Sequence, residues 1–252
     1  RRVLFRSMNR CDRLTVLRDG NIIRTFTAEE FDEDAIKTSM IGRELQGNYY
    51  RDDFDEDAGK EVVLKADHLN LGNQLIDFSF ELHKGEILGI GGLSHCGMHT
   101  LGKVLFAAIK PESGLDKFSI HNTLILPGKE KEYVSRQVEA LSIKCNSANQ
   151  YVSALSGGNK QKVAFGKWIG RDSGILILDC PTRGVDIGVK QAMYQLMYQM
   201  RQENKSIILI SEEMAELIGM SDRLLIMKDG RLQKELLRSK ELNEADVIRY
   251  MI

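Results

Sequence analysis

The stretch GILILDCPTRGVDIG, from Gly174 to Gly188, decides most of what can be said about the fold from sequence. It holds a short apolar run that ends in Asp179, followed by a turn. A helical stretch comes next, and SIILIS (206–211) then repeats the apolar pattern. Short apolar runs separated by a helical segment are typical of buried parallel strands joined by crossovers. The sequence therefore predicts an α/β domain built on a parallel sheet.

The composition is that of an ordinary globular protein. Of its 252 residues, 42% are hydrophobic and 28% are charged, and the formal net charge is −1. The near-neutral charge gives no indication of a surface that binds nucleic acid. No apolar run approaches the roughly 20 residues that a membrane-spanning helix needs. The four cysteines form no CxxC pair, which is typical of a reducing compartment. Any role at a membrane is expected to depend on a partner.

Two segments near the ends of the chain resemble each other. CDRLTVLRDGNIIRTF (11–26) aligns without gaps with SDRLLIMKDGRLQKEL (221–236). Each copy is typical of a strand, an Asp-Gly turn, a strand and a short helix. Only one full domain lies between them, so we expect residues 1–45 to be the tail of a preceding domain. The acidic stretch 46–60 is predicted to be a solvated linker that leads into a domain over 61–252.

The segment ALSGGNKQKVAFGKWIG, from Ala154 to Gly170, is the strongest functional signal. Ser156, Gly157 and Gly158 place a hydroxyl and bare backbone N–H groups at the start of a helix, which is an arrangement that binds anions. Taken alone, such a turn is more simply a helix cap. Asp179 likewise either holds Mg²⁺ on a nucleotide or merely ends its strand before a proline turn.

Together, LSGGNKQK and LILDCPTRGVD resemble the motifs of the ATP-binding-cassette family, in particular those of the second cassette of fused sugar-importer ATPases. The resemblance covers Glu61–Ile252. It implies a P-loop NTPase-like fold with a parallel core sheet, an antiparallel β-subdomain and a possibly incomplete helical subdomain. The resemblance also assigns Ser156, Gly157, Gly158 and Asn159 to the signature loop, Asp179 to the Walker B magnesium carboxylate, and Asp186 to the D-loop over Gly184–Gly188.

The phosphate loop departs from the family pattern. By resemblance it consists of Gly92, Leu93, Ser94, His95, Cys96, Gly97, Met98 and His99. Both bracketing glycines are kept, but Met98 stands at the lysine position and His99 at that of the magnesium-binding hydroxyl. A lost charge-assisted hydrogen bond costs about 1.5–3 kcal/mol, which is about one to two powers of ten in affinity.

Catalytic positions are replaced as well. Cys180 stands where a carboxylate should activate water, and Glu212 stands near the usual position of the switch histidine. No aromatic residue near Leu71 is available to stack on adenine. Because loss of a general base costs about 10²–10⁴ in rate, we expect no hydrolysis at this site and weak binding of ATP and Mg²⁺. The signature loop is instead expected to complete the nucleotide site of an N-terminal cassette in the same subunit.

The resemblance further implies integral-membrane permease subunits and, indirectly, a sugar-binding protein as partners, at the cytoplasmic face of the cell membrane. It implies no nucleic-acid partner. The interval from Gly97 to Ser156 is several tens of residues shorter than such a cassette requires. Either segments are missing near Gly114–Leu115 and Pro127–Gly128, or the protein carries a real deletion.

Several alternatives stay open. The chain could be a non-hydrolysing structural or regulatory cassette, or an importer ATPase for a nucleoside. His95, Cys96, His99 and Cys180 could bind a soft metal such as zinc, although degeneracy of the site explains the same residues. A cassette that acts on nucleic acid is disfavoured by the near-neutral charge and by the PTRGVD form of the motif.

Overall fold

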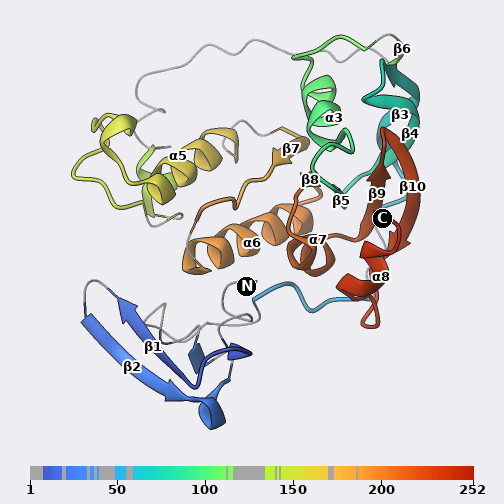
Figure 1. The fold of residues 1–252 in the computed structure, drawn as a ribbon. Helices are drawn as coiled ribbons and strands as arrows, with labels where there is room; N and C mark the ends of the chain where they lie inside the picture. The colour runs from blue at the N-terminus through green and yellow to red at the C-terminus, as the bar shows by residue number, and fades with distance from the viewer. Residues whose placement is uncertain are drawn as a thin grey trace.

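The computed structural model describes residues 8–18, 21–32, 35–36, 39, 49–54, 59–111, 113–115, 134–139, 141, 143–169, 173–185 and 187–252. These residues form one central sheet, an antiparallel sheet that covers it, several helices and a separate N-terminal hairpin (Figure 1).

The five-stranded central sheet has the strand order β10-β9-β5-β8-β7. Its strands are β5 (Ile87–Gly92), β7 (Ile175–Asp179), β8 (Ser206–Ile210), β9 (Arg223–Lys228) and β10 (Arg231–Leu237). Strands β9, β5, β8 and β7 run parallel, and β10 runs antiparallel to β9. The predicted parallel core sheet is therefore confirmed.

Both faces of the central sheet are covered, which is why β5, β8 and β9 are apolar on both sides. The helices are α3 (Met98–Leu105), α5 (Gly157–Ile169), α6 (Ile187–Gln202), α7 (Met214–Met220) and α8 (Glu244–Ile248), and η2 (Val152–Ala154) precedes α5. On β8, Ile207 and Leu209 join the apolar cluster of α6 and α7, whereas Ile208 and Ile210 join that of α3.

An antiparallel sheet lies on the α3 side and matches the expected β-subdomain. It consists of β3 (Val62–Leu71), β4 (Leu75–His83) and β6 (Ser113–Leu115), in the order β4-β3-β6. Strand β6 runs through Gly114–Leu115, one of the two positions at which a missing segment is expected. The other, Pro127–Gly128, lies outside the described residues.

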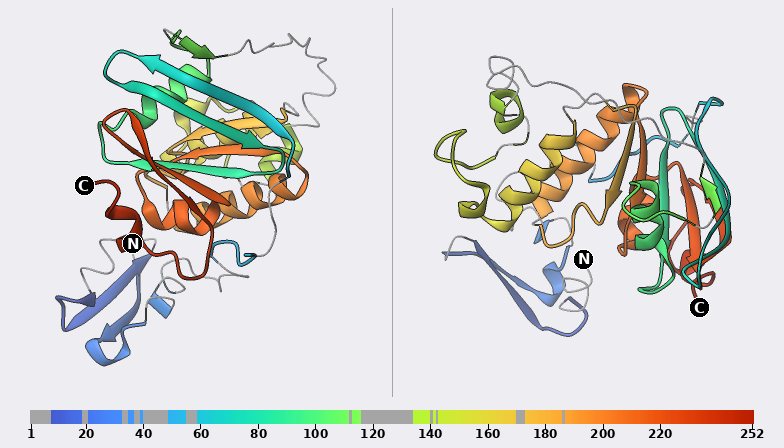
Figure 2. Two further views of the ribbon diagram at one scale, coloured as in Figure 1. Left: turned by 90° about the vertical axis from the view of Figure 1, so that its right-hand side faces the viewer. Right: turned by 90° about the horizontal axis from the view of Figure 1, so that it is seen from above.

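The N-terminal hairpin lies at one end of the molecule, away from the central sheet (Figure 2). It pairs β1 (Arg13–Arg18) with β2 (Asn21–Thr27), and η1 (Ala28–Glu30) follows. Its Asp-Gly turn lies outside the described residues. The two expected strands are present in both copies of the repeat, because β1 and β2 occupy the same repeat positions as β9 and β10.

The two hairpins also share an irregularity in their register. Val16 pairs with Arg24 and Leu17 with Ile22, so Ile23 is left as a bulge. In the second copy, the equivalent residues Ile226 and Met227 pair with Lys234 and Leu232. Because a bulge is a specific feature of a strand pair, its recurrence at one position supports a true repeat.

Within the stretch predicted to be a linker, Tyr50 and Arg51 pack against the domain that follows. The side chain of Arg51 is only 1% exposed, and its Nη1 lies 2.7 Å from Asp222 Oδ1. The backbone carbonyl of Arg51 accepts a hydrogen bond of 2.7 Å from Arg238 Nη2. The ring of Tyr50 packs on that of Tyr194, with 5.2 Å between centroids. The acidic composition gave no sign of this docking, because Asp222, Arg238 and Tyr194 each lie more than a hundred residues away in sequence.

Candidate functional site

The loop Gly92–His99 leads from β5 into α3 and is held in shape by close packing at Gly97. The φ angle of Gly97 is +100°, in the left-handed region that favours glycine. A Cβ at this position would lie 2.1 Å from the carbonyl oxygen of Gln74, in the turn between β3 and β4. Both the backbone angle and the packing therefore require glycine at this position.

Backbone N–H groups inside this loop are bonded to the loop itself. The backbone N–H groups of His95 and Cys96 both donate to the carbonyl of Leu93, at 2.9 Å each. Met98, at the position of the family lysine, is 1% exposed and belongs to the apolar cluster beneath the loop. Two N–H groups are thus used within the loop, and the position expected to supply a cation is apolar and buried.

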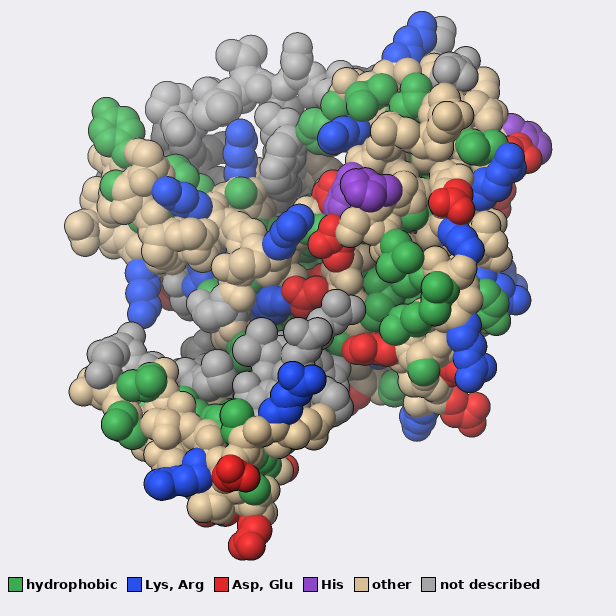
Figure 3. Space-filling model, viewed as in Figure 1, with side chains coloured by type: hydrophobic (Ala, Val, Ile, Leu, Met, Phe, Trp, Pro, Cys, Tyr) green, Lys and Arg blue, Asp and Glu red, His purple; other side chains and the backbone are tan. Residues whose placement is uncertain are grey.

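At the end of β7, the fold brings together four of the residues selected from the sequence. His99 Nδ1 lies 2.7 Å from Asp179 Oδ1, and His99 Nε2 lies 3.5 Å from Glu212 Oε1. Ligand-capable atoms of His99, Asp179 and Cys180 all lie within 4.8 Å of one another. Figure 3 shows histidine and acidic side chains side by side on this face, near α3. Among the described residues, this cluster includes neither His95 nor Cys96, and Cys96 is buried.

Cys180 does not resemble the general base that the family has at its position. Its φ angle is +47°, and its backbone N–H donates to Ile210 O at 2.9 Å, which fixes it against the end of β8. Burial raises the pKa of the Cys180 thiol to about 11, and the carboxylates of Asp179 and Glu212 act in the same direction. The thiol is therefore protonated at neutral pH and cannot accept a proton from water.

A buried carboxyl group beneath these loops was not anticipated from the sequence. Glu216, on α7, is fully buried; its Oε1 accepts a hydrogen bond of 2.6 Å from Thr182 Oγ1, and Ser211 Oγ donates to its Oε2. Burial raises its pKa. The group joins the loop after β7 to the loop after β8. Nothing in the local sequence distinguishes Glu216 from the exposed glutamates of other helices.

The residues at this corner do not fit Mg²⁺. Magnesium demands oxygen ligands in octahedral geometry. Here an imidazole replaces the expected hydroxyl ligand and lies against the one expected carboxylate, Asp179, and the next residue is a thiol. The expected role of Asp179 as a magnesium ligand is therefore not supported by its surroundings.

The loop before α5 is exposed and well supported. Ser156 and Gly157 are exposed at the helix start. Asn159 Nδ2 donates to Ser156 Oγ at 2.9 Å, and Asn159 Oδ1 accepts from the backbone N–H of Lys144 at 3.0 Å. These bonds hold the serine at the N-terminus of α5, where the helix dipole favours an anion.

The segment expected to be the D-loop is described only in part, because Asp186 lies outside the described residues. Gly184 has a φ angle of +74°. Gln161 Nε2 donates to the carbonyl of Arg183 at 2.7 Å, which ties α5 to the loop that follows β7.

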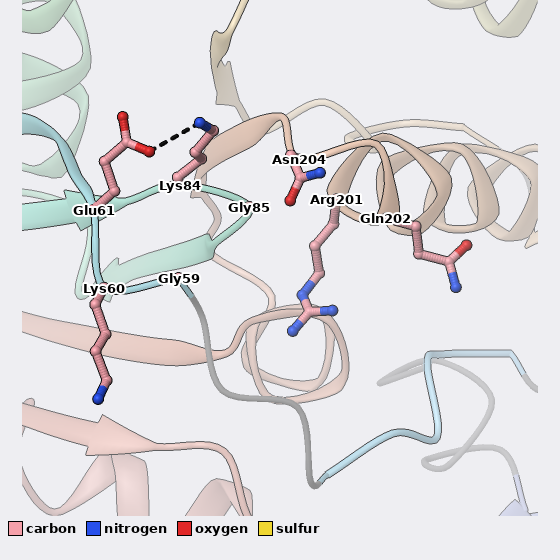
Figure 4. A pocket seen from close by; sticks show the side chains of 8 residues that line it. All are labelled: Gly59, Lys60, Glu61, Lys84, Gly85, Arg201, Gln202 and Asn204. Atoms are coloured by element: carbon pink, nitrogen blue, oxygen red, sulfur yellow. Dashed lines mark hydrogen bonds and ion pairs between the residues drawn. The ribbon is translucent and has the colours of Figure 1, made fainter.

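A separate open depression lies at the amino-terminal ends of β5 and β8 (Figure 4). It is lined by Gly59, Lys60, Glu61, Lys84, Gly85, Arg201, Gln202 and Asn204. Lys84 pairs with Glu61 at 2.8 Å, and Arg201 pairs with Asp222 at 3.0 Å. Because Lys84 precedes β5 and Asn204 precedes β8, the depression lies at the opposite end of these strands from the phosphate loop and Glu212, which follow them.

Comparison with known proteins places this arrangement in a family. No family model matches the chain. The chain is 31% identical to the ribose import ATP-binding protein of Clostridium tetani over 96% of its own length and 57% of the relative's. It is 32% identical to the galactose/methyl galactoside import ATP-binding protein of the same organism, over 95% of the chain and 56% of the relative.

Solved structures show the same fold. A bacterial ABC transporter cassette, solved as a dimer, matches with a TM-score of 0.62 at 17% identity, over 70% of this chain and 99% of its own. The protein cbiO1 from Clostridium perfringens, part of an ABC transporter complex, also matches with a TM-score of 0.62, at 21% identity, over 75% of this chain and 94% of its own. The chain is an ABC-transporter ATP-binding cassette. The expected family and fold class are thereby confirmed.

The cassette spans about half the length of the curated relatives it matches. The alignment with the Clostridium tetani ribose protein runs over 290 positions, more than the 252 residues of this chain. That relative therefore has residues without a counterpart here. In the described part of the cassette, no helix is both long and apolar enough to cross a membrane.

Proposed function

We propose that this cassette is part of the ATP-binding subunit of a carbohydrate importer, which couples ATP binding and hydrolysis to solute uptake. The curated relatives support this, since they are named as ribose and galactose import ATP-binding proteins. The subunit would act at the cytoplasmic face of the membrane, on integral-membrane permease subunits that receive solute from a sugar-binding protein. The N-terminal cassette of the same subunit would be the direct partner.

The N-terminal hairpin supports a preceding cassette. Leu17 of β1 is 65% exposed, whereas its repeat counterpart Met227 is fully buried in the central sheet. Among the described residues, β1 pairs only with β2, whereas β9 pairs with both β10 and β5. Residues 1–45 would therefore complete the sheet of the preceding cassette. Deletion of residues 1–45 should leave the urea unfolding midpoint of the rest of the chain unchanged, and a large downward shift would contradict this assignment.

The observation that carries the proposal is the exposed serine turn. Asn159 holds the Ser156 hydroxyl at the N-terminus of α5, and no side chain of the described structure covers Gly157, because a Cβ there would meet nothing within 4 Å. Such a group of donors is suited to a phosphate presented by another cassette. We assign Ser156–Asn159 to the closure of the partner's nucleotide site.

The cassette's own site is assigned a degenerate role. Met98 is buried, the N–H groups of His95 and Cys96 are used within the loop, and Cys180 is a protonated thiol. None of these features supports turnover of a magnesium nucleotide. The chain by itself should release phosphate from ATP no faster than a buffer blank, and brisk hydrolysis would contradict the assignment.

The signature loop is tested in the two-cassette subunit. Ser156→Arg should abolish most ATPase activity, because a bulky cation replaces the hydroxyl donor. Ser153→Arg is the matched control, since Ser153 is an exposed serine three residues earlier in the same segment. Full activity of Ser156→Arg would instead favour a cassette that is only structural or regulatory.

A further inference from the structure

We propose that His99, Asp179 and Cys180 form a binding site for Zn²⁺ at the corner where the family places magnesium. The three residues come from the start of α3, the last position of β7 and the residue that follows it. Their ligand-capable atoms lie within 4.8 Å of one another. The proposal goes beyond the function assigned above, because it concerns metal binding by this chain alone.

The chemistry of the three donors selects the metal. An imidazole nitrogen, a carboxylate oxygen and a thiolate sulfur are the ligand types that bind Zn²⁺, and a thiolate is a poor ligand for Mg²⁺ or Ca²⁺. On binding, the Cys180 thiol loses its proton to solvent and the sulfur forms the bond to zinc. The oxidation state of every atom is unchanged.

The backbone holds two of the ligands on a rigid element. Asp179 pairs in register with Ile210 of the neighbouring parallel strand β8, and the N–H of Cys180 donates to the carbonyl of Ile210 at 2.9 Å. His99 follows Gly97, whose packing against the β3–β4 turn fixes the start of α3. A site supported by strands and a helix start loses little entropy when a metal binds.

Zinc binding would require the His99–Asp179 pair to open slightly, while any ligand atoms that lie up to 4.8 Å apart would move closer together. Ligand atoms in tetrahedral zinc coordination lie about 3.3–3.8 Å apart, given bonds of about 2.0–2.3 Å. His99 Nδ1 and Asp179 Oδ1 are already 2.7 Å apart, so the metal would replace the hydrogen bond between them.

A second carboxylate and a small cavity lie beside the cluster. Glu212 Oε1 is 3.5 Å from His99 Nε2. A cavity of about 40 Å³ is lined in part by Cys180, Ser211 and Glu212, which is enough for a water molecule or an ion. The side chains of His99 and Asp179 are 37% and 39% exposed, so an ion can enter from solvent. Bound zinc would join the phosphate loop to the end of β7.

The test uses the full chain after treatment with a chelator. Zn²⁺ should bind with one equivalent per chain by calorimetry, and Co²⁺ should give a thiolate-to-cobalt charge-transfer band together with the visible bands of tetrahedral cobalt. Cys180→Ser should remove the charge-transfer band, and His99→Ala should weaken Zn²⁺ binding by at least about 10-fold. Excess Mg²⁺ should not displace the metal.

The controls are chosen from residues that resemble the ligands but lie outside the cluster. His95→Ala changes an exposed histidine on the same loop, and Cys11→Ser removes an exposed cysteine elsewhere. Both should bind Zn²⁺ and Co²⁺ as the parent chain does, with circular dichroism to confirm that each variant is folded. Absence of binding to the folded parent chain, or binding that survives both His99→Ala and Cys180→Ser, would overturn the proposal. Neither result depends on the ATPase test of Ser156.

Discussion

Arg51 and Asp222 form an ion pair of 2.7 Å in which the side chains are only 1% and 8% exposed. The pair joins the segment before the cassette to the residue that precedes β9. Arg201 contacts the same carboxylate at 3.0 Å, and Asp222 Oδ2 accepts the backbone N–H of Ile87 at 2.8 Å. One buried carboxylate therefore holds together three parts of the chain that are far apart in sequence.

Removal of this carboxylate should be costly. Asp222→Ala leaves the buried guanidinium groups of Arg51 and Arg201 with Asp53 as their remaining shared carboxylate. We expect the free energy of unfolding, measured by urea denaturation, to fall by about 3–5 kcal/mol. Lys84→Ala is the control, because the Lys84–Glu61 pair is exposed and should contribute less than about 1 kcal/mol. Equal losses in the two variants would contradict the role given to Asp222.

The buried carboxyl of Glu216 should make stability depend on pH. Its pKa is raised above the ordinary value of 4.5 by burial, so the folded chain keeps a proton that the unfolded chain loses as the pH rises above 4.5. The contribution of Glu216 to the free energy of unfolding therefore falls from about pH 4.5 up to its raised pKa.

Glu216→Gln removes this titration while keeping groups that can bond to Thr182 and Ser211. The stability of the variant relative to the parent chain should rise with pH through that window. The measurement is urea denaturation at a series of pH values from about 4 to about 8. A stability difference that is constant with pH would show that Glu216 has the same pKa in the folded and unfolded chains.

Gly97 should tolerate no side chain. Gly97→Ala places a Cβ 2.1 Å from Gln74 O and requires a left-handed backbone, so we expect a loss of more than about 2 kcal/mol in the free energy of unfolding. In Gly174→Ala the new Cβ meets nothing within 4 Å, and stability should change by no more than about 0.5 kcal/mol. The free energies of unfolding of both variants are measured by chemical denaturation. Similar values for Gly97→Ala and Gly174→Ala would mean that the β3–β4 turn moves freely to make room for the new Cβ.

Asn159 should position the signature serine. Asn159→Ala removes the hydrogen bond to Ser156 Oγ and the one from the backbone of Lys144. In the two-cassette subunit we expect kcat to fall by about 10-fold, because loss of one such bond costs about 1.4 kcal/mol. Ser153→Ala serves as the control in the same steady-state ATPase assay. Unchanged kcat in Asn159→Ala would show that the serine is positioned without this side chain.

The sequence located much of the candidate site. The chemistry of the site could not be predicted from the sequence. The positions of the phosphate loop, the Asp179 strand end and the serine turn follow from local patterns. The direct contact of His99 Nδ1 with Asp179 Oδ1 depends on the packing of α3 beside β7, which no local pattern encodes. The burial of Met98 was equally hidden, since a methionine in a loop motif gives no sign of where its side chain lies.

By itself, the sequence determined the parallel sheet, the repeated hairpin and the order of the motifs. These features are encoded by neighbouring residues, namely apolar runs, an Asp-Gly turn and a Ser-Gly-Gly helix start. Only the tertiary structure decided that His99, Asp179, Cys180 and Glu212 meet, and that Arg51 finds Asp222. Such contacts depend on which strand lies beside which, and strand order is set by packing of the whole core rather than by any local pattern.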